Sequence, residues 1–412
     1  MNRRYFLSAL AASASVRVMR PAGARITRIS VAPIEGRFHK FVTINAYDRV
    51  PKGHTYSNHL IRIQTSQGVE GVGVMGYRTP DEAFYKALRT LVGADPLAVY
   101  QMDGGRITGR AQPHEDTLRT YAFLDGAMFD LIGKLTGKAA WQLIGDSARD
   151  RVETYDGTLY FSDVWFRDRG VKAVVEEAEE AMKAGYRGIK LKLGRGWKWM
   201  EPEPGFLRDV EVVHAVRKAV GPDMRIMVDI NNGFQKEPER AWRLLQETAA
   251  DNLYWLEEPF PEQVGLYTEL RAKMQKGGIR TLIADGENVR QSSELAAYIE
   301  PKMLVDVLQM DIRTCGLLEN AALARRAGPL GAVCIPHNWG SQAGGLMGLQ
   351  LSKAVKWVPA AEDDRSTCDV LIAEGYEFRG GSYAVPDKPG LSVRVDEAVY
   401  RLKCKAAEVV VG

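Results

Sequence analysis

Residues 188–288 contain four short apolar runs, GIKLKLG (188–194), RIMVDINN (225–232), LYWLEEP (253–259) and TLIADGEN (281–288). Runs of this length, rich in branched and aromatic residues and separated by helical stretches, are typical of parallel strands. The last three runs carry acidic residues near their ends, Asp229, Glu257 and Glu287. Because all strands of a parallel barrel end at one mouth, the pattern predicts that these three carboxylates meet there.

Eight such runs predict a (β/α) barrel over residues 151–379. They lie near residues 152, 188, 225, 253, 281, 305, 332 and 357, with helical stretches such as VKAVVEEAEEAMKAG (171–185) between them. The alternative, a doubly wound open sheet, needs a glycine-rich phosphate-binding turn after its first strand. The segment DGTLYFSD (156–163) has no such turn. We therefore predict an α/β fold built on a barrel.

Residues 25–150 predict a separate α+β domain. Alternation of apolar and polar residues up to about residue 70 favours strands, and apolar spacing of three and four over residues 80–145 is typical of helices. The polar segment 47–58, rich in His and Tyr, is expected to be a loop that closes over the barrel mouth, with a solvated surface loop as the alternative. Residues 380–412 contain too many turn formers for a barrel helix, and we expect them to return to the N-terminal domain.

The composition is that of an ordinary globular protein. The chain has 412 residues, 45% hydrophobic and 26% charged, with a net charge of +3. So small a charge, without a basic run, argues against nucleic acid or a membrane surface as partner. The 4 cysteines lack metal-ligand spacing and are too few for a disulfide framework.

The first 24 residues predict an export signal. RRYFL (3–7) resembles a twin-arginine signal, a weakly apolar stretch follows, and AGA (22–24) offers a cleavage site. Arg17 and Arg20 shorten the apolar stretch, so a disordered tail is the alternative. The first interpretation places the protein in the periplasm and the second in the cytoplasm.

A divalent cation is the ligand that three convergent carboxylates predict. Asp229, Glu257 and Glu287 offer only oxygen, which favours Mg²⁺ over zinc, for which we would expect His or Cys. Of the adjacent acids Glu257 and Glu258, strand alternation turns only one inward, and we assign Glu257 to the metal. One acid at a strand end is often a helix N-cap, but three on successive strands are harder to explain in that way.

Lys190 and Lys192 lie two residues apart on a predicted strand, so both side chains point into the mouth. A buried lysine is costly unless it serves a site or pairs with an acid. A neighbouring lysine and a divalent cation would lower the pKa of Lys192 towards the range of a useful base. A purely structural ion pair with the acids is the alternative.

His337 and Asp311 end two neighbouring runs on the side of the mouth opposite Lys192. There they could form a dyad in which the carboxylate orients the imidazole and raises its basicity. Glu362 ends the eighth run. It could donate a hydrogen bond to a substrate carboxylate if protonated, or it could cap the following helix.

From about residue 25 onward, the chain resembles the mandelate racemase subgroup of the enolase superfamily. The segments that carry the resemblance are DGAMFDLIGKLTGKAAWQLIG (125–145), VRKAVGPDMRIMVDINNGF (216–234), WLEEPFPE (255–262) and VPDKPGLSVRVDE (385–397). A lysine at the sixth strand end would instead mark the muconate-lactonising and dipeptide-epimerase group, and Asp311 stands there. The resemblance implies a (β/α)7β TIM-like barrel under an α+β capping domain.

The resemblance also implies a role for each candidate residue. The Mg²⁺ ligands, one ion per subunit, would be Asp229, Glu257 and Glu287. The acid/base groups would be Lys192, with Lys190 as its electrostatic partner, and His337 with Asp311, while Glu362 matches the family's electrophilic glutamate. Some sugar-acid dehydratases of the superfamily carry a His where this chain has Asn231.

We predict a hydro-lyase that removes the proton α to the carboxylate of an acid sugar and eliminates water to give a 2-keto-3-deoxy acid. An α-hydroxy-acid racemase or epimerase would use the same two bases, and a non-catalytic binding protein is a third interpretation. The polar segment, with Tyr56 and His59, suits a polyhydroxylated substrate. We expect a small-molecule carboxylate as partner and a homo-oligomer as assembly.

Overall fold

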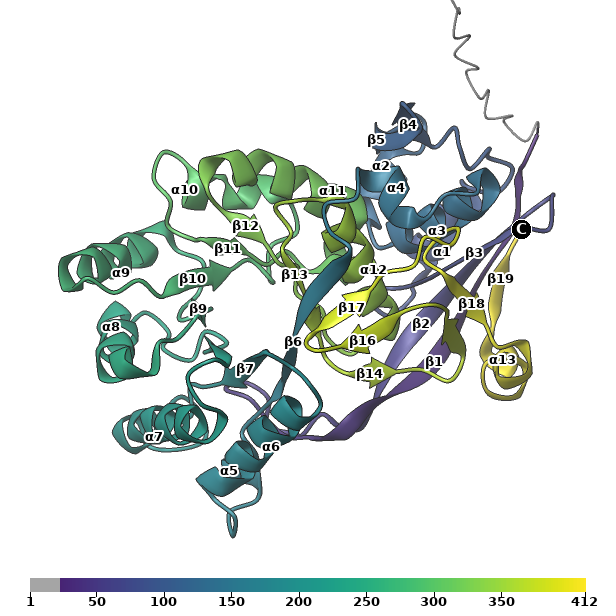
Figure 1. Cartoon of the computed structure of the whole chain (residues 1–412). Coiled ribbons are helices and arrows are strands. Elements are labelled where there is room, and N and C mark those ends of the chain that lie inside the picture. Colours follow the sequence, from purple (N-terminus) through teal and green to yellow (C-terminus); the bar gives the residue numbers. More distant parts are fainter. Residues whose placement is uncertain (1–22) are drawn as a thin grey trace, which may run out of the picture.

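The computed structural model describes residues 23–412, so the twin-arginine motif lies outside the described residues. The N-terminal part contains an antiparallel sheet in the order β14–β1–β2–β3 (Figure 1). Its strands are β1 (Ile26–Val42), β2 (Gly53–Thr65), β3 (Glu70–Val74) and β14 (Ser366–Thr367). Buried and exposed residues alternate along much of β1, as expected for a strand with one face on the core.

Helix α3 (Leu124–Thr136) packs against β3, and two glycines make the close approach possible. A Cβ atom at Gly73 would lie 2.5 Å from the backbone nitrogen of Ala127, and one at Gly71 would lie 2.2 Å from the Ala127 carbonyl oxygen. The other helices of this part are α1 (Glu82–Arg89), α2 (Glu115–Thr120) and α4 (Ala140–Ile144).

The segment predicted to be helical contains a β-hairpin, so that prediction is wrong at residues 100–110. Strands β4 (Tyr100–Asp103) and β5 (Arg106–Arg110) pair antiparallel across a two-residue turn. Gly104 and Gly105 form this turn with φ values of 55° and 79°. Two glycines with positive φ are a strong hairpin signal, which the helical spacing on either side obscured.

Eight parallel strands follow, and their pairing order is β12–β11–β10–β9–β8–β7–β6–β13. They are β6 (Arg151–Leu159), β7 (Gly188–Lys192), β8 (Arg225–Asp229), β9 (Trp255–Glu257), β10 (Leu282–Asp285), β11 (Val307–Leu308), β12 (Val333–Cys334) and β13 (Ala360–Asp363). A hydrogen bond of 2.9 Å from Cys334 N to Trp357 O links β12 to the chain entering β13. The strands therefore form a ring, and each lies at or near one of the eight predicted runs.

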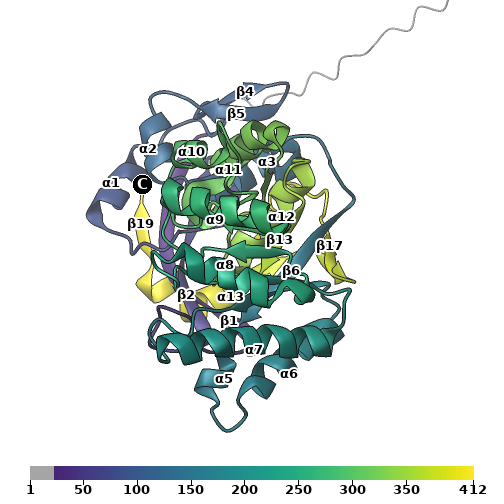
Figure 2. The same ribbon diagram turned by 90° about the vertical axis from the view of Figure 1, so that its left-hand side faces the viewer.

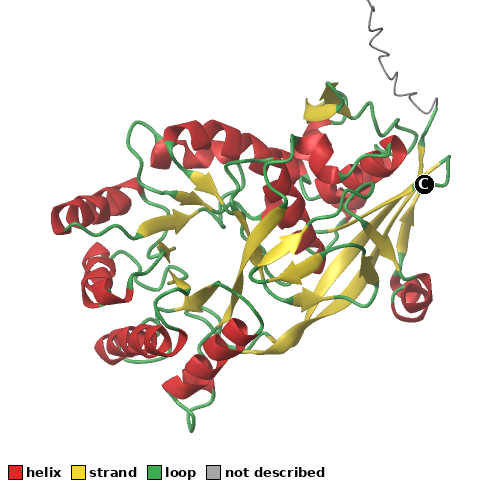
Figure 3. Ribbon diagram, in the orientation of Figure 1, coloured by secondary structure: helices red, strands yellow, loops and turns green. Residues whose placement is uncertain are grey.

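Helices connect these strands and lie outside them (Figures 2 and 3). They are α5 (Ser162–Trp165), α6 (Val171–Lys183), α7 (Pro202–Val220), α8 (Pro238–Glu247), α9 (Val264–Gly277), α10 (Ala296–Ile299), α11 (Ile312–Ala327) and α12 (Gln342–Ala354). Helix α6 shows why they pack there, since Ala173, Val174, Ala178 and Ala181 form a buried stripe at helical spacing. The structure confirms the predicted alternation of strands and helices and the α/β class.

A layer of apolar side chains fills the interior of the ring. It is made of Tyr155, Met227, Trp255, Ala284, Val307, Ile335 and Ala360, contributed by or next to different strands. The interior is thus a packed core rather than a pore, as in other parallel barrels. Polar side chains that point inward beyond this layer must gather at the carboxyl ends of the strands.

The register of three neighbouring strands places Lys192, Asp229 and Glu257 in one row. Lys192 pairs with Asp229, and Asp229 pairs with Glu257. Lys190 and Trp255 occupy the row two residues below, where each pairs with Met227. Because side chains alternate along a strand, all of these inward positions share one orientation.

The last part of the chain contacts both the ring and the N-terminal sheet. Strand β17 (Ser382–Ala384) pairs with β6 and with β16 (Glu377–Arg379), and β19 (Val409–Val411) pairs with β1. Between them lie β15 (Leu371–Ala373), β18 (Val393–Val395) and α13 (Glu397–Lys403). Among residues 23–412, no helix is long and apolar enough to cross a membrane.

Candidate active site

Three carboxylates meet at the carboxyl ends of the barrel strands. Asp229 is the last residue of β8, Glu257 is the last residue of β9, and Glu287 lies two residues after β10. Their oxygen atoms lie within 4.8 Å of one another. Asp229 and Glu257 are buried, whereas Glu287 is partly exposed, so the group is accessible from the Glu287 side.

Buried donors orient Glu257. Trp255 Nε1 and Gln309 Nε2 donate to its Oε2 at 2.9 and 3.0 Å, and Lys190 Nζ donates to its Oε1 at 2.6 Å. Burial, with the charge of Asp229, raises the pKa of Glu257 above its ordinary value against the opposing charge of Lys190. Trp255 and Gln309 were missed from the sequence, although Trp255 lies two residues before Glu257 and so on the same strand side.

Glu258, the acid next to Glu257, turns away from the carboxylate group. Its φ is 41°, in the left-handed region, which ends the strand at Glu257. Its carboxylate accepts hydrogen bonds from Asn231 Nδ2 at 3.2 Å and Asn288 Nδ2 at 2.6 Å. Of the two adjacent acids, only Glu257 therefore joins the group.

Lys190 and Lys192 project from β7 into the same group. Lys190 Nζ lies 2.6 Å from Glu257 Oε1 and 2.8 Å from Glu362 Oε1, and Lys192 Nζ donates to Asp229. Burial and the charge of Lys190 lower the pKa of Lys192, but the charge of Asp229 outweighs them and the pKa is raised well above its ordinary value. The predicted lowering of the Lys192 pKa depends on a divalent cation beside the lysines, so it stays a prediction.

No spacing in the sequence predicts the ion-pair network behind Lys192. The guanidinium of Arg195 is fully buried, lies 2.7 Å from Asp163 Oδ1 and 2.8 Å from Asp209 Oδ1, and donates to the Lys192 carbonyl at 3.2 Å. Asp163 lies on α5 and Asp209 on α7. Arg195 thus ties two helices to the end of β7 and fixes the backbone that carries Lys192.

His337 and Asp311 form a hydrogen-bonded pair. His337 Nδ1 lies 2.7 Å from Asp311 Oδ2, and His337 Nε2 lies 3.4 Å from Glu287 Oε2. Asp311 is also the N-cap of α11, because its Oδ1 accepts from Thr314 N at 2.6 Å. Burial lowers the pKa of His337, but the charge of Glu287 and the hydrogen bond with Asp311 raise it to about 9.

Glu362 faces Lys190 from β13. Its Oε1 lies 2.8 Å from Lys190 Nζ, and its Oε2 accepts from Asn338 N at 3.0 Å. The chain after β13 continues into β14 rather than into a helix. The interpretation of Glu362 as a helix cap is therefore wrong, and the residue belongs to the charged group.

The polar segment is shorter than predicted, so Tyr56 and His59 lie on β2 rather than in a loop. The pairing of β2 with β1 continues through both residues, which leaves residues 43–52 as the connection. The Tyr56 hydroxyl donates to Thr367 O at 3.2 Å and accepts from Gln342 N at 3.3 Å. His59 is partly buried, which lowers its pKa.

Tyr47 and Asn231 lie beside the charged group. Partial burial raises the pKa of Tyr47, although the residue is 42% exposed, and the charges of Glu287 and Lys192 act on that pKa in opposite directions. Tyr47, on the connection 43–52, therefore lies near the mouth. Asn231 N donates to Asp229 Oδ1 at 2.9 Å, while its own Oδ1 is buried and accepts no hydrogen bond from the described residues.

The residues present fit a hard divalent cation. Asp229, Glu257 and Glu287 supply only oxygen ligands, at a separation that one ion can bridge. Glu287 Oε2 is buried and accepts no hydrogen bond of good geometry from residues 23–412, as expected of an oxygen reserved for another ligand. Mutual repulsion of three carboxylates so close together also favours a cation between them.

The part of the chain that forms most of the barrel matches a known family. A sequence model described as "Enolase C-terminal domain-like" matches residues 173–399. Two relatives are each 28% identical. D-galactarolactone cycloisomerase of Agrobacterium fabrum aligns over 82% of this chain and 88% of its own length, and arabinonate dehydratase of Saccharolobus solfataricus over 69% and 72%.

The whole fold is similar to a solved enzyme structure. Galacturonate dehydratase from Geobacillus sp., determined with D-galacturonate and 5-keto-4-deoxy-D-galacturonate, matches with a TM-score of 0.82 and 26% identity. The match covers 94% of this chain and 99% of that chain. A variant of the same enzyme was solved in complex with Mg. The described N-terminal part and ring together thus have a counterpart in one known enzyme.

Proposed function

The chain belongs to the enolase C-terminal domain-like family, and from this premise we infer that it is a Mg²⁺-dependent dehydratase of acid sugars. The observation that carries the proposal is the presence of two acid/base groups, Lys192 and His337, around one carboxylate group. Proton removal next to a carboxylate needs such a base, together with positive charge to stabilise the dianion that forms. The dehydratases among its relatives support water loss as the outcome.

Asp229, Glu257 and Glu287 would hold the ion. When bound, Mg²⁺ would bind the substrate carboxylate and stabilise the negative charge that develops on it. We propose one ion per subunit, because these three acids form a single group around the lysines. Metal analysis of the purified enzyme should give one Mg²⁺ per chain, and Glu258→Gln should leave that number unchanged.

The acid/base groups divide the reaction between them. Lys192 in its neutral form would take the α-proton, so that the C–H electron pair becomes the enediolate. His337 would donate its proton to the β-hydroxyl as the C–O bond breaks and water leaves. The resulting enol then takes a proton at the β-carbon to give the 2-keto-3-deoxy acid. The hydrogen bond of 2.7 Å between His337 Nδ1 and Asp311 Oδ2, which stabilises the protonated imidazole, supports its role as the acid.

Lys190 and Glu362 would act on the substrate carboxylate rather than on the α-proton. Lys190 is held between Glu257 and Glu362, at 2.6 and 2.8 Å. Its positive charge disfavours a second ammonium at Lys192, and a cation held by Asp229 would offset the carboxylate charge that raises the Lys192 pKa. A protonated Glu362 would donate a hydrogen bond to the enediolate.

A racemase or epimerase of α-hydroxy acids is the second candidate. Lys192 ends β7 and His337 lies three residues after β12, at different places around the mouth, and they could exchange a proton on opposite faces of one carbon. Incubating the enzyme with a library of acid sugars and Mg²⁺ distinguishes the two. A dehydratase yields a 2-keto-3-deoxy acid, whereas a racemase yields only the epimer. If neither product forms, the chain is a binding protein.

Substrate contacts and cellular location are further parts of the proposal. Tyr47 and Asn231, which lie beside the charged group, and Tyr56 and His59 on β2 are proposed to select among acid sugars. His59→Ala should change the relative rates on a sugar-acid panel.

We also propose export by the twin-arginine route. Replacing Arg3 and Arg4 by Lys should then retain the protein in the cytoplasmic fraction, and unchanged fractionation would contradict export.

A further inference from the structure

Tyr77 reaches the His337–Asp311 pair from the N-terminal part of the chain. It lies three residues after β3, and the residue is 52% exposed. Its hydroxyl lies 3.1 Å from Asp311 Oδ2 and 3.3 Å from the Trp339 carbonyl oxygen. A hydroxyl has one proton to donate, and a charged carboxylate is the stronger acceptor. The bond to Asp311 is therefore the favoured one.

The hydrogen bond from Tyr77 completes the set of donors around Asp311. Thr314 N donates to Oδ1 at 2.6 Å, and His337 Nδ1 lies 2.7 Å from Oδ2, the same oxygen that Tyr77 contacts. Burial raises the pKa of Asp311, but the hydrogen bond and charge of His337 outweigh it and hold the pKa below its ordinary value. With donors on both oxygens, the carboxylate cannot rotate freely, and the imidazole bonded to it is held in one orientation.

Arg313 holds Tyr77 in place. Its guanidinium lies 4.3 Å from the centre of the Tyr77 ring, and its Nη1 donates to the Trp339 carbonyl at 2.6 Å. The same side chain, 3% exposed, donates to Asn58 on β2 and to the Met75 carbonyl at 3.2 Å. Tyr77 is thus fixed where the N-terminal sheet meets the start of α11, rather than lying loosely on the surface.

Lys192 has a different support. Its Nζ contacts Asp229 and lies 5.4 Å from the ring centre of Tyr160, and Arg195 binds its carbonyl. All of these residues belong to the ring of strands or to its connections. Of the two acid/base groups, only His337 is thus linked, within residues 23–412, by a hydrogen-bond chain to a side chain of the N-terminal part.

We propose that Tyr77 is a positioning residue for the dehydration reaction: it acts through Asp311 to orient His337, and leaves Lys192 unaffected. The proposal rests on the proposed function. Proton donation to the leaving hydroxyl then requires contact between the N-terminal part and the barrel, whereas removal of the α-proton does not. The structure therefore assigns a catalytic purpose to one contact between the two parts.

The test uses Tyr77→Phe, with Tyr121→Phe as a matched control that removes a hydroxyl elsewhere in the N-terminal part. Loss of a hydrogen bond to a charged group should lower the dehydration rate of Tyr77→Phe roughly ten- to a hundred-fold, while Tyr121→Phe stays within about twofold of the wild type. In a His337→Asn background, α-proton exchange in D₂O reports on Lys192 alone. There Tyr77→Phe should add no further loss, because its effect passes through His337.

Wild-type dehydration in Tyr77→Phe, or a further loss of exchange in the His337→Asn background, would overturn the proposal. Failure of the wild-type enzyme to dehydrate any acid sugar would instead defeat the proposed function. In that case nuclear magnetic resonance of ¹⁵N-histidine-labelled protein decides the matter, since the chain has only 6 His. The His337 ring signal, assigned by its loss in His337→Asn, should shift in Tyr77→Phe and not in Tyr121→Phe; an unchanged signal would contradict the link.

Discussion

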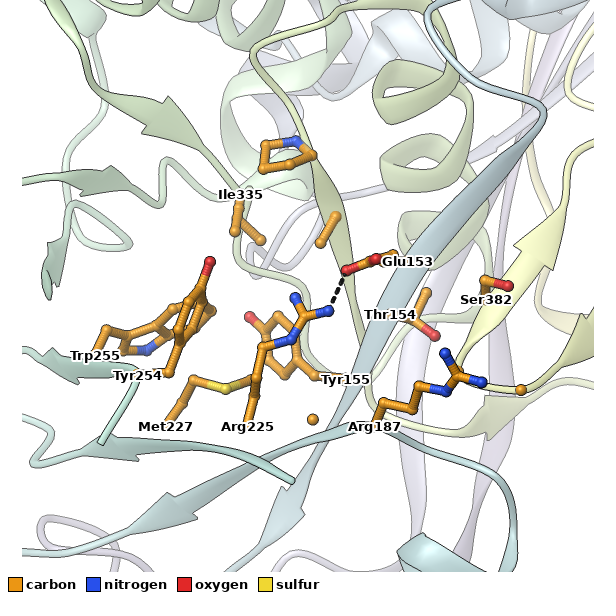
Figure 4. A pocket seen from close by; sticks show the side chains of 15 residues that line it. Glu153, Thr154, Tyr155, Arg187, Arg225, Met227, Tyr254, Trp255, Ile335 and Ser382 are labelled. Carbon is orange, nitrogen blue, oxygen red and sulfur yellow. Dashed lines mark hydrogen bonds and ion pairs between the residues drawn. The ribbon is translucent and has the colours of Figure 1, made fainter. Parts of the chain in front are cut away.

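The two ends of the barrel both carry charged side chains, but among the residues that the structure describes only the carboxyl end brings several of them together in a buried group. At the amino end, a cavity of about 120 Å³ is lined by Arg187, Arg225, Glu153 and several aromatic residues (Figure 4). In its lining, Arg225 Nη2 lies 2.7 Å from Glu153 Oε2, and these two side chains are 44% and 55% exposed. At the other end, Lys190 is 1% exposed and lies within 3.5 Å of three carboxylates.

This difference shows that the arrangement of charges, rather than the presence of a cavity, identifies the active site. Burying charges costs several kcal/mol per ion, and even good pairing often only offsets that cost. A buried cluster of two lysines and several acids is therefore a poor device for stability and a strong indication of function. The exposed pair at the amino end has no such cost and needs no functional explanation.

The largest expected effect comes from removing a metal ligand at the carboxyl end. Asp229→Asn and Glu287→Gln should each lower the dehydration rate by about 10⁴-fold or more, because the ion supplies several kcal/mol of transition-state stabilisation. The circular dichroism spectrum should stay unchanged. Full activity of enzyme treated with a chelator would contradict the assignment of these acids.

Next in size are the two acid/base groups. Losing a general acid or base costs on the order of 10²–10⁴ in rate, so Lys192→Ala and His337→Asn should both be severely impaired in dehydration. His337→Asn should still exchange the α-proton of its substrate in D₂O, whereas Lys192→Ala should not. Equal exchange in the two variants would reverse the roles proposed for them.

Breaking the ion-pair network around Arg195 is expected to lower the stability of the fold rather than to remove a catalytic group. Arg195→Met leaves Asp163 and Asp209 buried without a positive partner, which should cost about 3–5 kcal/mol of unfolding free energy. Urea denaturation measures this directly. A change below about 1 kcal/mol, within the range of exposed pairs, would show that the network is not needed for the fold.

A smaller effect should separate the two tyrosines proposed to contact the substrate. Tyr47→Phe should raise KM roughly tenfold by removing one hydrogen bond to the substrate. Tyr56→Phe removes bonds to Thr367 and Gln342 instead, and should cost about 1 kcal/mol of stability with KM changed less. If Tyr56→Phe raised KM more than Tyr47→Phe, then Tyr56 rather than Tyr47 would contact the substrate.

The smallest effect is expected at the amino end of the barrel. Arg225→Met breaks the pair with Glu153, yet it should change the unfolding free energy by no more than about 1 kcal/mol and leave the dehydration rate unaltered. Steady-state kinetics and urea denaturation of this variant provide the control for every variant at the carboxyl end. A tenfold loss of rate would mean that the two ends are functionally coupled.

Much of the barrel could be predicted from the sequence because its signals are local and repeat. Each signal spans only a few residues of sequence: an acid at the end of a strand, a Lys-x-Lys pair, or a turn between two apolar runs. Strand alternation predicts that only one of Glu257 and Glu258 faces the mouth, but it does not say which. The structure brings the predicted charged residues together around one mouth, as the convergence of parallel strands requires.

The parts that could not be predicted depend on contacts between distant segments. Arg195 meets Asp163 and Asp209 only after α5 and α7 have packed, and Tyr77 meets Asp311 only after the N-terminal sheet has docked. The prediction that Tyr56 lies in a loop was wrong because the polar residues continue into β2. There, pairing with β1 decides the structure despite the polar composition.

Deuterium incorporation during dehydration tests the central claim most directly. The wild-type enzyme is incubated with Mg²⁺ and a panel of acid sugars in D₂O, and the product is analysed by nuclear magnetic resonance. The account predicts a 2-keto-3-deoxy acid that carries one solvent deuterium at C3, because the enol formed by water loss takes its proton there. Recovery of every sugar without deuterium at its α-carbon would show that the charged group removes no proton and would contradict the account.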